Sequence, residues 1–469
     1  MSPGAKRASS AQRLPAGASA IVECTGASRA PESPGSPAPR PRRPAIHTVL
    51  GARSATMAQT APRHVPVNLR QTGSNGTRLL VDTRVRKSPF WHLSVEHGCW
   101  SATVYNHMYH PRAYIPLEEG GLLKEYEYLT NHVTLWNVAV ERQIRIKGPD
   151  ALDFADLLVT RDLHRKCPVP GKCRYVLLCD ESGGIVNDPV LLRVAEDEIW
   201  LSISDSDVLT WARGVAMGRS YNVAIDEIDV SPLQIQGPKA RDLMNRLVAL
   251  GRMGAEVLEL RYYHMCHTRF DGIDVVVSRT GFSGEIGYEL YLPEADRHAE
   301  AVWGALMEVG AELHIRVIAP SHIRRLEAGI LSYGQDMDLS TSPFEVGLGW
   351  QVDFDKEDFI GKRALAEIAR RGVDRRLVGV AMEGDPISWY PADFYPVYEA
   401  AADRDIGYVT SAFQSPSLGC NIGLAMVPTS HAEPGTPLRV GLPEHPEPVR
   451  AAVAEVPFKD PLKQIPKAS

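Results

Sequence analysis

Two glutamates with interleaved glycines form the stretch of this sequence that most directly suggests chemistry. The stretch RTGFSGEIGYELYL, residues 279–292, otherwise reads as a strand, and it places Glu285 and Glu289 four residues apart. An even spacing in a strand puts both side chains on one face. Glycine inside a strand pattern usually marks a bulge or a close approach of the backbone to another group. The stretch therefore predicts that another group lies close to the backbone of this strand, beside one or both carboxylates.

Histidine and cysteine residues do not combine into a metal site in this sequence. His264, Cys266 and His267 lie within four residues, but alternation in an extended segment would place His267 on the face opposite the other two. The seven cysteines are an odd number and include no C-x-x-C pair. Free thiols in a reducing compartment are the expectation, and no metal is predicted.

Composition and charge narrow the classes of partner. The chain has 469 residues, of which 44% are hydrophobic and 23% are charged, as in ordinary globular proteins of two or three domains. Residues 1–70 hold ten basic residues against two acidic ones, which leaves 41 basic against 55 acidic residues in the rest. The excess of acidic residues after residue 70 does not indicate nucleic-acid binding. No apolar run is long enough for a membrane span or a signal peptide, so a cytoplasmic protein without a membrane partner is expected.

The elements that must position these residues fall into three regions. Residues 1–66 are rich in Arg, Pro, Ser, Ala and Gly, which predicts a disordered or non-native extension. A transit peptide and a translation start at Met57 are the alternatives. In residues 67–372, the phrase RQIRIKGPDALDFADLLV (142–159) recurs as SPLQIQGPKARDLMNRLV (231–248). Internal duplication into two α/β half-domains with a ligand cleft between them is the economical explanation.

Local signals place further elements around these repeats. Residues 172–194 contain two apolar runs joined by Glu-Ser-Gly-Gly, which predicts a hairpin. Asp150 is a predicted helix cap, and Asp205 or Ser206 is a predicted cap for the helix that follows them. Residues 373–469 read as short strands separated by many Pro and Gly residues, so a small C-terminal β-barrel is expected. The fold class is therefore α+β.

Six motifs give this sequence a family resemblance. They are CDESGGIVNDPVLL, IQGPKA, RTGFSGEIGYELYL, RRLEAGILSYGQDMD, FIGKRAL and IGYVTSAFQSPSLGCNIGLAMV. In order and spacing they resemble the T-protein of the glycine cleavage system, the tetrahydrofolate-dependent aminomethyltransferases, from about residue 85 to 463. Phrases of the N-terminal half, such as VYNHMY, LWNVAVERQIRIKGPDA and LSISDSDVLTWARGVAMG, are similar to the dimethylsulfoniopropionate demethylase branch of that superfamily.

The resemblance implies a site that holds tetrahydrofolate. It implies that Glu289 accepts hydrogen bonds from the pterin and that Asp188 lies beside folate N5, where a carboxylate stabilises the developing cation and helps to remove the N5 proton. A turn-capping role is the alternative for Asp188, and a solvated or salt-bridged role is the alternative for Glu285. Four further residues match positions that line the folate site, with ordinary packing or surface pairing as the alternatives: Tyr175, Arg325, Tyr333 and Trp350. Arg325 would suit the glutamate tail of folate.

Recognition of a cationic methyl donor requires aromatic faces, because a sulfonium or quaternary ammonium centre has no hydrogen bond to offer. Tyr105 and Phe282 are the predicted substrate-binding residues. The weaker candidates are Trp91, Trp100, Trp200 and Trp211. Against the demethylase branch, GFSGEIGYE reads like the aminomethyltransferases.

Three functions follow from this resemblance. The first is a tetrahydrofolate-dependent methyltransferase, or demethylase, that takes a methyl group from a small onium or methylated amine donor such as dimethylsulfoniopropionate. The alternative is the aminomethyltransferase of the glycine cleavage system, which would require a lipoyl carrier protein as partner. The third is a non-enzymatic folate-binding factor for iron–sulfur assembly. Its Lys-Gly-Cys-Tyr type motif is not reproduced by KCRYVLL (172–178), which lacks the glycine.

Overall fold

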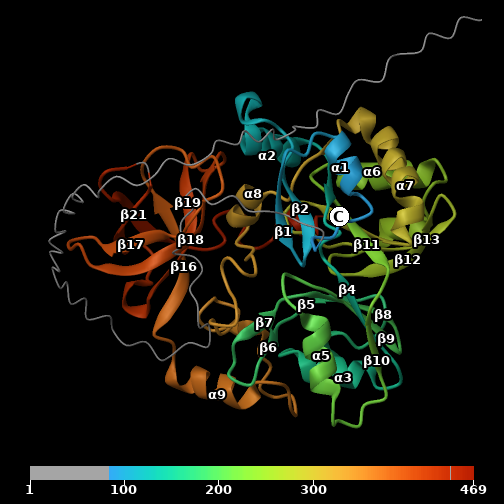
Figure 1. Cartoon of the computed structure of the whole chain (residues 1–469), viewed down its shortest axis with the longest axis horizontal. Coiled ribbons are helices and arrows are strands. Elements are labelled where there is room, and N and C mark those ends of the chain that lie inside the picture. The colour runs from blue at the N-terminus through green and yellow to red at the C-terminus, as the bar shows by residue number, and fades with distance from the viewer. Residues whose placement is uncertain (1–83, 444, 469) are drawn as a thin grey trace, which may run out of the picture. The chain divides into compact units, whose positions relative to one another are not determined.

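The computed structural model describes residues 84–443 and 445–468. The prediction for residues 1–66 therefore lies outside the described residues. Within the described part of the chain, strands form two open sheets, a closed barrel and two short hairpins. Helices cover the open sheets, and the barrel lies at the C-terminal end of the chain, drawn in orange and red in Figure 1. This arrangement confirms the α+β class and the C-terminal barrel.

The first half of the duplicated region is a five-stranded antiparallel sheet in the order β10-β4-β9-β8-β5. Fully buried apolar side chains of its helices, such as Phe154 and Ala212, pack in one cluster with strand residues such as Ile146 and Leu201. The strands are β4 (Gln143–Lys147), β5 (Cys173–Tyr175), β8 (Val190–Ala195), β9 (Glu198–Ser202) and β10 (Ala224–Glu227), and the helices are α3 (Ala151–Leu158), α4 (Leu163–Lys166) and α5 (Val208–Ala216).

The second half is a six-stranded sheet in the order β12-β13-β14-β11-β3-β15, antiparallel except where β15 runs parallel to β3. Leu243 and Leu306 from its helices are buried against strand residues such as Leu290, and Figure 1 shows these helices beside the sheet. The strands are β3 (Thr134–Asn137), β11 (Val230–Gln236), β12 (Met265–Phe270), β13 (Ile273–Ser278), β14 (Gly287–Pro293) and β15 (Arg316–Val317), and the helices are α6 (Ala240–Ala249) and α7 (Ala295–Gly310), with α1 (Trp91–Glu96) and α2 (Gly121–Asn131) preceding them.

Both copies of the repeated phrase fold in the same way. Strand β4 leads into α3 and strand β11 leads into α6, each through a glycine with positive φ, 146° at Gly148 and 125° at Gly237. A Cβ on Gly148 would lie 2.2 Å from the carbonyl oxygen of Asn222, and one on Gly237 would lie 2.3 Å from the carbonyl oxygen of His132. Only glycine fits at either position, and this shared constraint supports the duplication.

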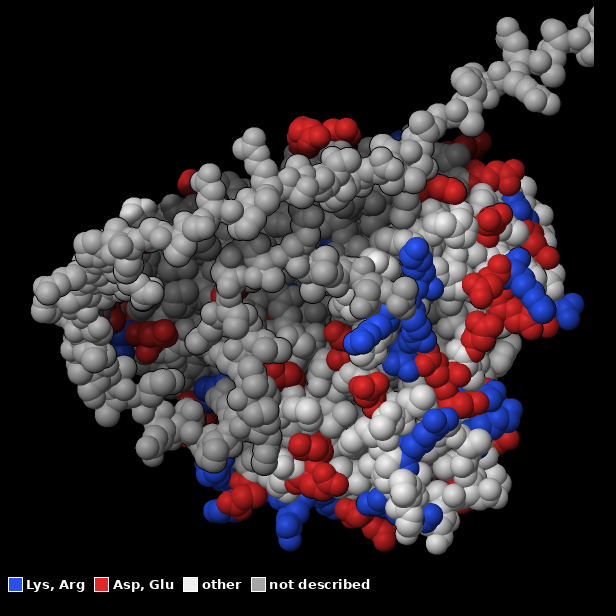
Figure 2. Space-filling view, viewed as in Figure 1, with Lys and Arg blue, Asp and Glu red and all other residues white. Residues whose placement is uncertain are grey.

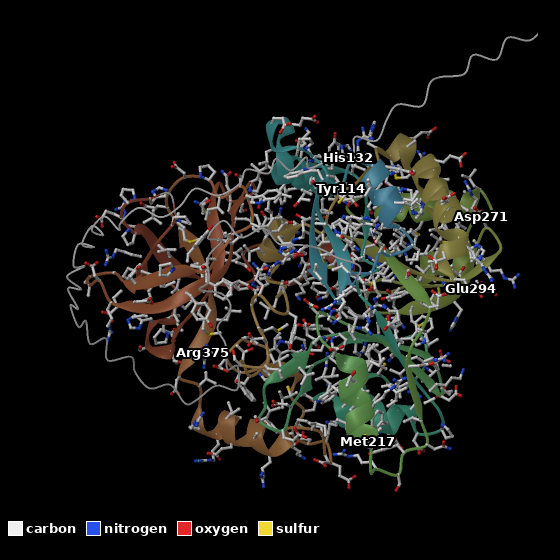
Figure 3. All side chains as sticks on the ribbon, in the orientation of Figure 1. Tyr114, His132, Met217, Asp271, Glu294 and Arg375 are labelled. Carbon is white, nitrogen blue, oxygen red and sulfur yellow. The ribbon has the colours of Figure 1, made fainter. Side chains whose placement is uncertain are left out.

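The C-terminal barrel closes through six strands in the order β16-β19-β18-β17-β20-β21. Arg375, labelled in Figure 3, begins β16, and its guanidinium donates hydrogen bonds to the Glu345 carboxylate at 2.6 Å and the Tyr408 hydroxyl at 3.2 Å. The strands are β16 (Arg375–Met382), β17 (Tyr395–Glu399), β18 (Asp405–Ser415), β19 (Cys420–Pro428), β20 (Pro437–Val440) and β21 (Val449–Ala454), and the nearby helices are α8 (His322–Glu327), α9 (Lys362–Arg371) and α10 (Gln464–Lys467).

Two short hairpins carry or adjoin two of the residues predicted to do chemistry, Tyr105 and Asp188. The first pairs β1 (Ser101–Tyr105) with β2 (Met108–Ala113), and the second pairs β6 (Leu178–Cys179) with β7 (Ile185–Asn187). The second confirms the hairpin predicted from Glu-Ser-Gly-Gly. In its turn, the Asp180 carboxylate accepts hydrogen bonds from two backbone N–H groups, those of Ser182 and Gly184, each at 2.9 Å.

The predicted helix cap is confirmed in position at α3 and wrong at α5. Asp150 is the N-cap residue of α3, although its carboxylate accepts the backbone N–H of Asn222 at 2.7 Å and makes no cap hydrogen bond. Helix α5 begins after Asp207 instead of Asp205 or Ser206, and Asp205 accepts the backbone N–H of Asn106 at 2.7 Å. Both carboxylates join segments that are distant in sequence, which local capping signals cannot reveal.

Charges are interspersed on the surface. Figure 2 shows acidic and basic side chains next to one another, without a broad area of one sign on the described part of that face. Among the described residues, no helix combines the length and the apolar character that crossing a membrane requires.

Candidate active site

Asp188 lies directly after β7, at the base of the second hairpin. Its carboxylate is 8% exposed and accepts hydrogen bonds from the Tyr175 hydroxyl at 3.0 Å and the Ser204 hydroxyl at 2.6 Å. Burial raises the pKa of Asp188 to about 7, although the two hydroxyl donors act in the opposite direction. A carboxyl group that changes charge near neutral pH can stabilise a developing cation or accept a proton. The structure thus brings the predicted residues Tyr175 and Asp188 together.

Asn187 orients the serine that bonds Asp188. Its side-chain amide donates to the backbone carbonyl of Ser204 at 3.0 Å and to the Ser206 hydroxyl at 2.8 Å, while its oxygen accepts the Ser204 N–H at 3.1 Å. This arrangement fixes the loop after β9 against the end of β7. Sequence reasoning missed Ser204, because nothing in its neighbourhood shows that this loop faces Asp188.

Tyr105 stands at the tip of the β1–β2 hairpin, close to Asp188. Burial and then the negative charge of Asp188 raise the pKa of its phenol, with smaller contributions from Glu141 and Asp205. The next residue, Asn106, adopts φ of 48° and donates from its side chain to the carbonyls of Val140 at 3.0 Å and Ser204 at 3.1 Å. Asn106 therefore holds the hairpin tip, and with it Tyr105, against the Asp188 loop.

Glu289 lies on β14 with 3% exposure. One carboxylate oxygen accepts from the Gln234 amide at 2.8 Å, and the other accepts from the Tyr291 hydroxyl at 2.6 Å. Burial raises the pKa of Glu289 despite these donors. The side-chain oxygen of Gln234 is buried and has no hydrogen-bond partner. A buried carboxylate beside an unpaired carbonyl is a set of acceptors, and it fits the N–H-rich edge of the predicted pterin.

Glu141 is a third carboxylate of this region, and sequence reasoning missed it. It lies two residues before β4, is half-buried, and accepts a hydrogen bond from the Ser202 hydroxyl at 3.2 Å. Burial raises the pKa of Glu141 well above its ordinary value, with the negative charges of Glu289 and Asp188 adding to the effect. A charged residue just before a buried strand was the available signal, but it has many ordinary explanations.

The three carboxylates lack cationic partners. Among the ion pairs of residues 84–443 and 445–468, none includes Asp188, Glu141 or Glu289, and Arg142, which is adjacent to Glu141 in the chain, pairs with Glu227. Unpaired buried carboxylates cost free energy when ionised. The arrangement therefore favours a ligand with N–H donors or positive charge.

Two other predicted folate residues flank the Asp188 region. The Tyr333 hydroxyl donates to the carbonyl of Ile185 at 3.0 Å, and the charge of Asp188 contributes to raising its pKa after burial does. Trp350 is 62% exposed, so core packing does not explain it. Its ring lies 5.2 Å from the guanidinium of Arg161, which donates to the carbonyl of Tyr175. Trp350 is thereby linked to the strand that carries Tyr175.

The candidate aromatic residues separate in space. Phe282 packs beside Trp136 and lies 6.4 Å from the ring of His322, away from the immediate partners of Asp188. The four weaker candidates have other neighbours: Trp91 stacks on Tyr109, Trp100 on Trp389, Trp200 packs near Tyr291, and Trp211 packs against the core of the five-stranded sheet.

Arg325, predicted to bind the glutamate tail of folate, lies among protein partners in this structure. The Arg325 side chain is fully buried and forms an ion pair with Asp336. It also donates to the carbonyl of Ile330 and to the Ser411 hydroxyl of the barrel. The guanidinium is enclosed by protein, although its Nε atom is buried without a hydrogen-bond partner. Its other contacts join α8 to the barrel.

The glycines of the opening stretch make room for another side chain. A Cβ on Gly281 or Gly287 would lie within 2.4 Å of the side-chain amide of Gln236, a residue of β11. Glu285 lies before β14 instead of on it and forms a buried ion pair with Arg324 at 2.7 Å. The expectation that Glu285 and Glu289 share one strand face is therefore wrong.

Comparisons with known proteins agree with this architecture. Residues 90–356 match the model of the GCVT N-terminal domain, and residues 375–460 match that of the glycine cleavage T-protein C-terminal barrel domain. The structure is similar to the glycine cleavage system aminomethyltransferase T of Bartonella henselae, with a TM-score of 0.68 and 24% identity, over 80% of this chain and 98% of that one. At that identity the likeness shows the fold.

Two curated relatives cover most of the described residues. The dimethylsulfoniopropionate demethylase DmdA of Ruegeria pomeroyi is 39% identical over 368 residues, which span 78% of this chain and 96% of that protein. The aminomethyltransferase of Halothermothrix orenii is 32% identical over 331 residues, which span 70% of this chain and 88% of that protein. Both the domain matches and these identities lead to one conclusion: the chain belongs to the glycine cleavage T-protein family of tetrahydrofolate-dependent enzymes.

Proposed function

We propose that this protein is a tetrahydrofolate-dependent methyltransferase that demethylates a small cationic donor, either an onium compound such as dimethylsulfoniopropionate or a methylated amine. One observation carries the proposal: three carboxylates without ion-pair partners among the described residues lie in succession, with Asp188 and Glu141 near Tyr105 and Glu289 near Glu141. Glu289 with Gln234 suits the pterin, which leaves Asp188 and Glu141 for the cationic centre. The 39% identity to the demethylase of Ruegeria pomeroyi supports the same choice.

When bound, tetrahydrofolate supplies N5 as the methyl acceptor: the methyl carbon bonds to N5 as its bond to the donor's sulfur or nitrogen breaks, the electron pair leaves with the donor, and N5 loses its proton. The chain's residues set the conditions for that transfer. Ionised Asp188, held by Tyr175 and Ser204, stabilises the positive charge that N5 gains and accepts the proton. Holding both reactants in one pocket makes the displacement effectively unimolecular.

The test is an assay of the purified chain with tetrahydrofolate and a panel of donors, in which 5-methyltetrahydrofolate is measured by mass spectrometry. The panel contains dimethylsulfoniopropionate, glycine betaine, dimethylglycine and sarcosine. We expect methyltetrahydrofolate with one of these donors, and its loss in Asp188→Ala. If none of the free donors reacts, the methyltransferase proposal is wrong.

Aminomethyl transfer is the second candidate, because the stretch GFSGEIGYE resembles the aminomethyltransferases and the Halothermothrix orenii relative carries that name. This reaction would take its substrate from a lipoyl carrier protein. An aminomethyl-loaded carrier in the same panel, with 5,10-methylenetetrahydrofolate as product, separates the two candidates. The iron–sulfur assembly alternative has less support, since Cys173 is fully buried and burial raises the pKa of its thiol. The six described cysteines are all unpaired, which suits the reducing cytoplasm.

A further inference from the structure

The β1–β2 hairpin presents an aromatic ring, an imidazole and a guanidinium in succession. In the hairpin register, Tyr105 opposes Met108 and Thr103 opposes His110. Opposed residues share a face, as do alternate residues of one strand, so Tyr105 and His110 point to the same side. Arg112 is the unpaired residue of a bulge two positions after His110, and its charge interacts with both Tyr105 and His110. The rings of Tyr105 and His110 lie 5.5 Å apart. The row therefore starts beside Asp188 and leads away from it to Arg112.

Arg112 lacks an acidic partner. Its side chain is half-buried, and its guanidinium lies 4.2 Å from the ring centre of Tyr390. Nη1 lies 2.8 Å from Nε2 of His322, whereas Nε and Nη2 form no hydrogen bond with any described residue. Among the described residues no carboxylate forms an ion pair with it. Glu125 is close enough for its negative charge to raise the pKa of Tyr390. Its carboxylate accepts hydrogen bonds from the backbone N–H groups of Tyr114, Ile115 and Ala319 and does not pair with Arg112.

Two guanidinium groups lie at this end of the row, and Arg325 is paired with Asp336, so Arg112 is the one that forms no ion pair with a described carboxylate. Burial, followed by the charge of Arg112, lowers the pKa of His110 to about 3 and that of His322 well below its ordinary range, so both imidazoles are neutral near pH 7. His110 is 7% exposed, and its Nδ1 atom is buried without a hydrogen-bond partner. A guanidinium that forms no ion pair with a described carboxylate, beside the unpaired buried nitrogen of His110, is suited to an anionic group.

We infer that Arg112 is a specificity-determining residue that binds the carboxylate of a zwitterionic methyl donor, while the donor's cationic centre lies toward Tyr105 and Asp188. This inference rests on the proposed methyl transfer and deepens it. The carboxylates of the site attract the positive end of the donor, and Arg112 at the far end of the same hairpin attracts the negative end. Phe282, which packs against His322, contributes the apolar wall near Arg112. The site therefore selects donors whose two charges are separated by a short chain.

Two comparisons test this inference. With the unaltered chain, dimethylsulfoniopropionate is compared with a dimethylalkylsulfonium of the same length that lacks the carboxylate, and we expect the latter's kcat/KM to be roughly 10–100-fold lower. With Arg112→Gln, the KM for the zwitterion should rise by about the same factor, while the KM for the carboxylate-free sulfonium stays within about twofold. The KM of Arg112→Lys for the zwitterion should lie between the values of the unaltered chain and of Arg112→Gln, because a lysine keeps the positive charge but lacks the planar guanidinium.

Controls separate a binding role from a folding role. Arg370→Gln removes an arginine of α9 that is paired with Glu367 and exposed, and it should leave both donors unaffected. Tetrahydrofolate binding and thermal unfolding of Arg112→Gln should match the unaltered chain. Equal activity on both donors in the unaltered chain, or an equal loss on both donors in Arg112→Gln, would overturn the inference although the methyltransferase proposal stands.

Failure of the proposed function gives a different result. Suppose that none of the sulfonium or amine donors gives methyltetrahydrofolate with the unaltered chain. Calorimetric titration with dimethylsulfoniopropionate still measures whether the donor binds. If binding weakens roughly 10–100-fold in Arg112→Gln, Arg112 still binds the carboxylate of the ligand even though the proposed reaction fails. If the unaltered chain does not bind this compound, or binds it as tightly as Arg112→Gln does, the inference is overturned.

Discussion

At the scale of single residues, the site is defined by acids placed where water cannot fully solvate them. Asp188, Glu141 and Glu289 are each bonded by hydroxyl or amide donors, and burial nevertheless dominates their pKa shifts. Such groups remain ready to gain charge when a cationic ligand arrives, because a nearby positive charge favours the ionised form. The first two predictions concern these side chains.

Activity should depend on the ionisation of Asp188. Burial raises its pKa from 3.8 to about 7, so the carboxylate is mostly protonated below neutral pH. We expect kcat/KM for the donor to rise about tenfold per pH unit below pH 7 and to level off above it. Asp188→Asn should lower kcat by roughly 10²–10⁴-fold and remove this rise. A rise that persists unchanged in Asp188→Asn would assign the titration to another group.

Glu289 should determine affinity for tetrahydrofolate. In Glu289→Gln, an amide N–H would face the N–H donors of the pterin, so we expect the Kd for tetrahydrofolate to rise about 10–100-fold. Fluorescence titration measures it. The matched control is Glu300→Gln on α7, where the glutamate side chain is 82% exposed and pairs only with His92 among the described residues. A Kd that is equal in the two variants would remove Glu289 from the pterin site.

At the scale of elements, the β1–β2 hairpin is the device that positions Tyr105 and the proposed Arg112 contact. Its tip is held by the side chain of Asn106, which donates to carbonyls before β4 and after β9. Its base continues into Tyr114, which is 5% exposed, packs into the core of the six-stranded sheet and is labelled in Figure 3. The hairpin is thus attached to both halves of the duplicated region.

Removing the side chain of Asn106 should loosen the hairpin tip. Asn106→Gly keeps the positive φ accessible and deletes the buried donors, so we expect a loss of about 1–3 kcal/mol in unfolding free energy. The KM for the donor should rise several-fold while tetrahydrofolate affinity is retained. His107→Gly is the matched control, since His107 also has positive φ, 59°, but is exposed. Equal stability in the two variants would show that Asn106 does not anchor the tip.

At the scale of the whole described molecule, buried ion pairs connect the second half of the duplicated region to the barrel. Asp336 accepts a hydrogen bond from Arg325 of α8. It also accepts hydrogen bonds from the hydroxyls of Thr410 and Ser411 in β18, each at 2.6 Å. Glu327 of α8 similarly accepts from the Ser417 hydroxyl at 2.7 Å. Breaking such a network leaves an uncompensated buried charge, which costs more than the intact pair contributes.

Arg325→Met should therefore act on stability instead of on folate binding. We expect a loss of about 3–5 kcal/mol in unfolding free energy, because Asp336 remains buried without its counter-ion. The double variant Arg325→Met, Asp336→Leu should recover part of that loss. Chemical denaturation measures both, and tetrahydrofolate affinity of the folded protein should stay within about threefold. A large loss of affinity with unchanged stability would restore the folate-tail assignment.

The sequence by itself determined the family resemblance, the duplication and the C-terminal barrel, and it indicated the roles proposed for Asp188 and Glu289. These follow from short motifs and local periodicity. The strand, glycine and helix succession at Gly148 and Gly237 is written in consecutive residues, and so is the alternation of the barrel strands. Local patterns of this kind depend on neighbours along the chain, so they can be recognised without the fold.

The tertiary structure alone decided which side chains meet. Ser204 bonds Asp188, Glu141 accepts from Ser202, and Gln236 fills the space left by the glycines of residues 279–292, each across a gap that no local pattern spans. Arg325 has the residue type of a carboxylate ligand, yet its burial against Asp336 gives it a structural role. Charge, burial and partner identity depend on segments brought together by folding, and for that reason the outline of the site was predictable whereas its network was not.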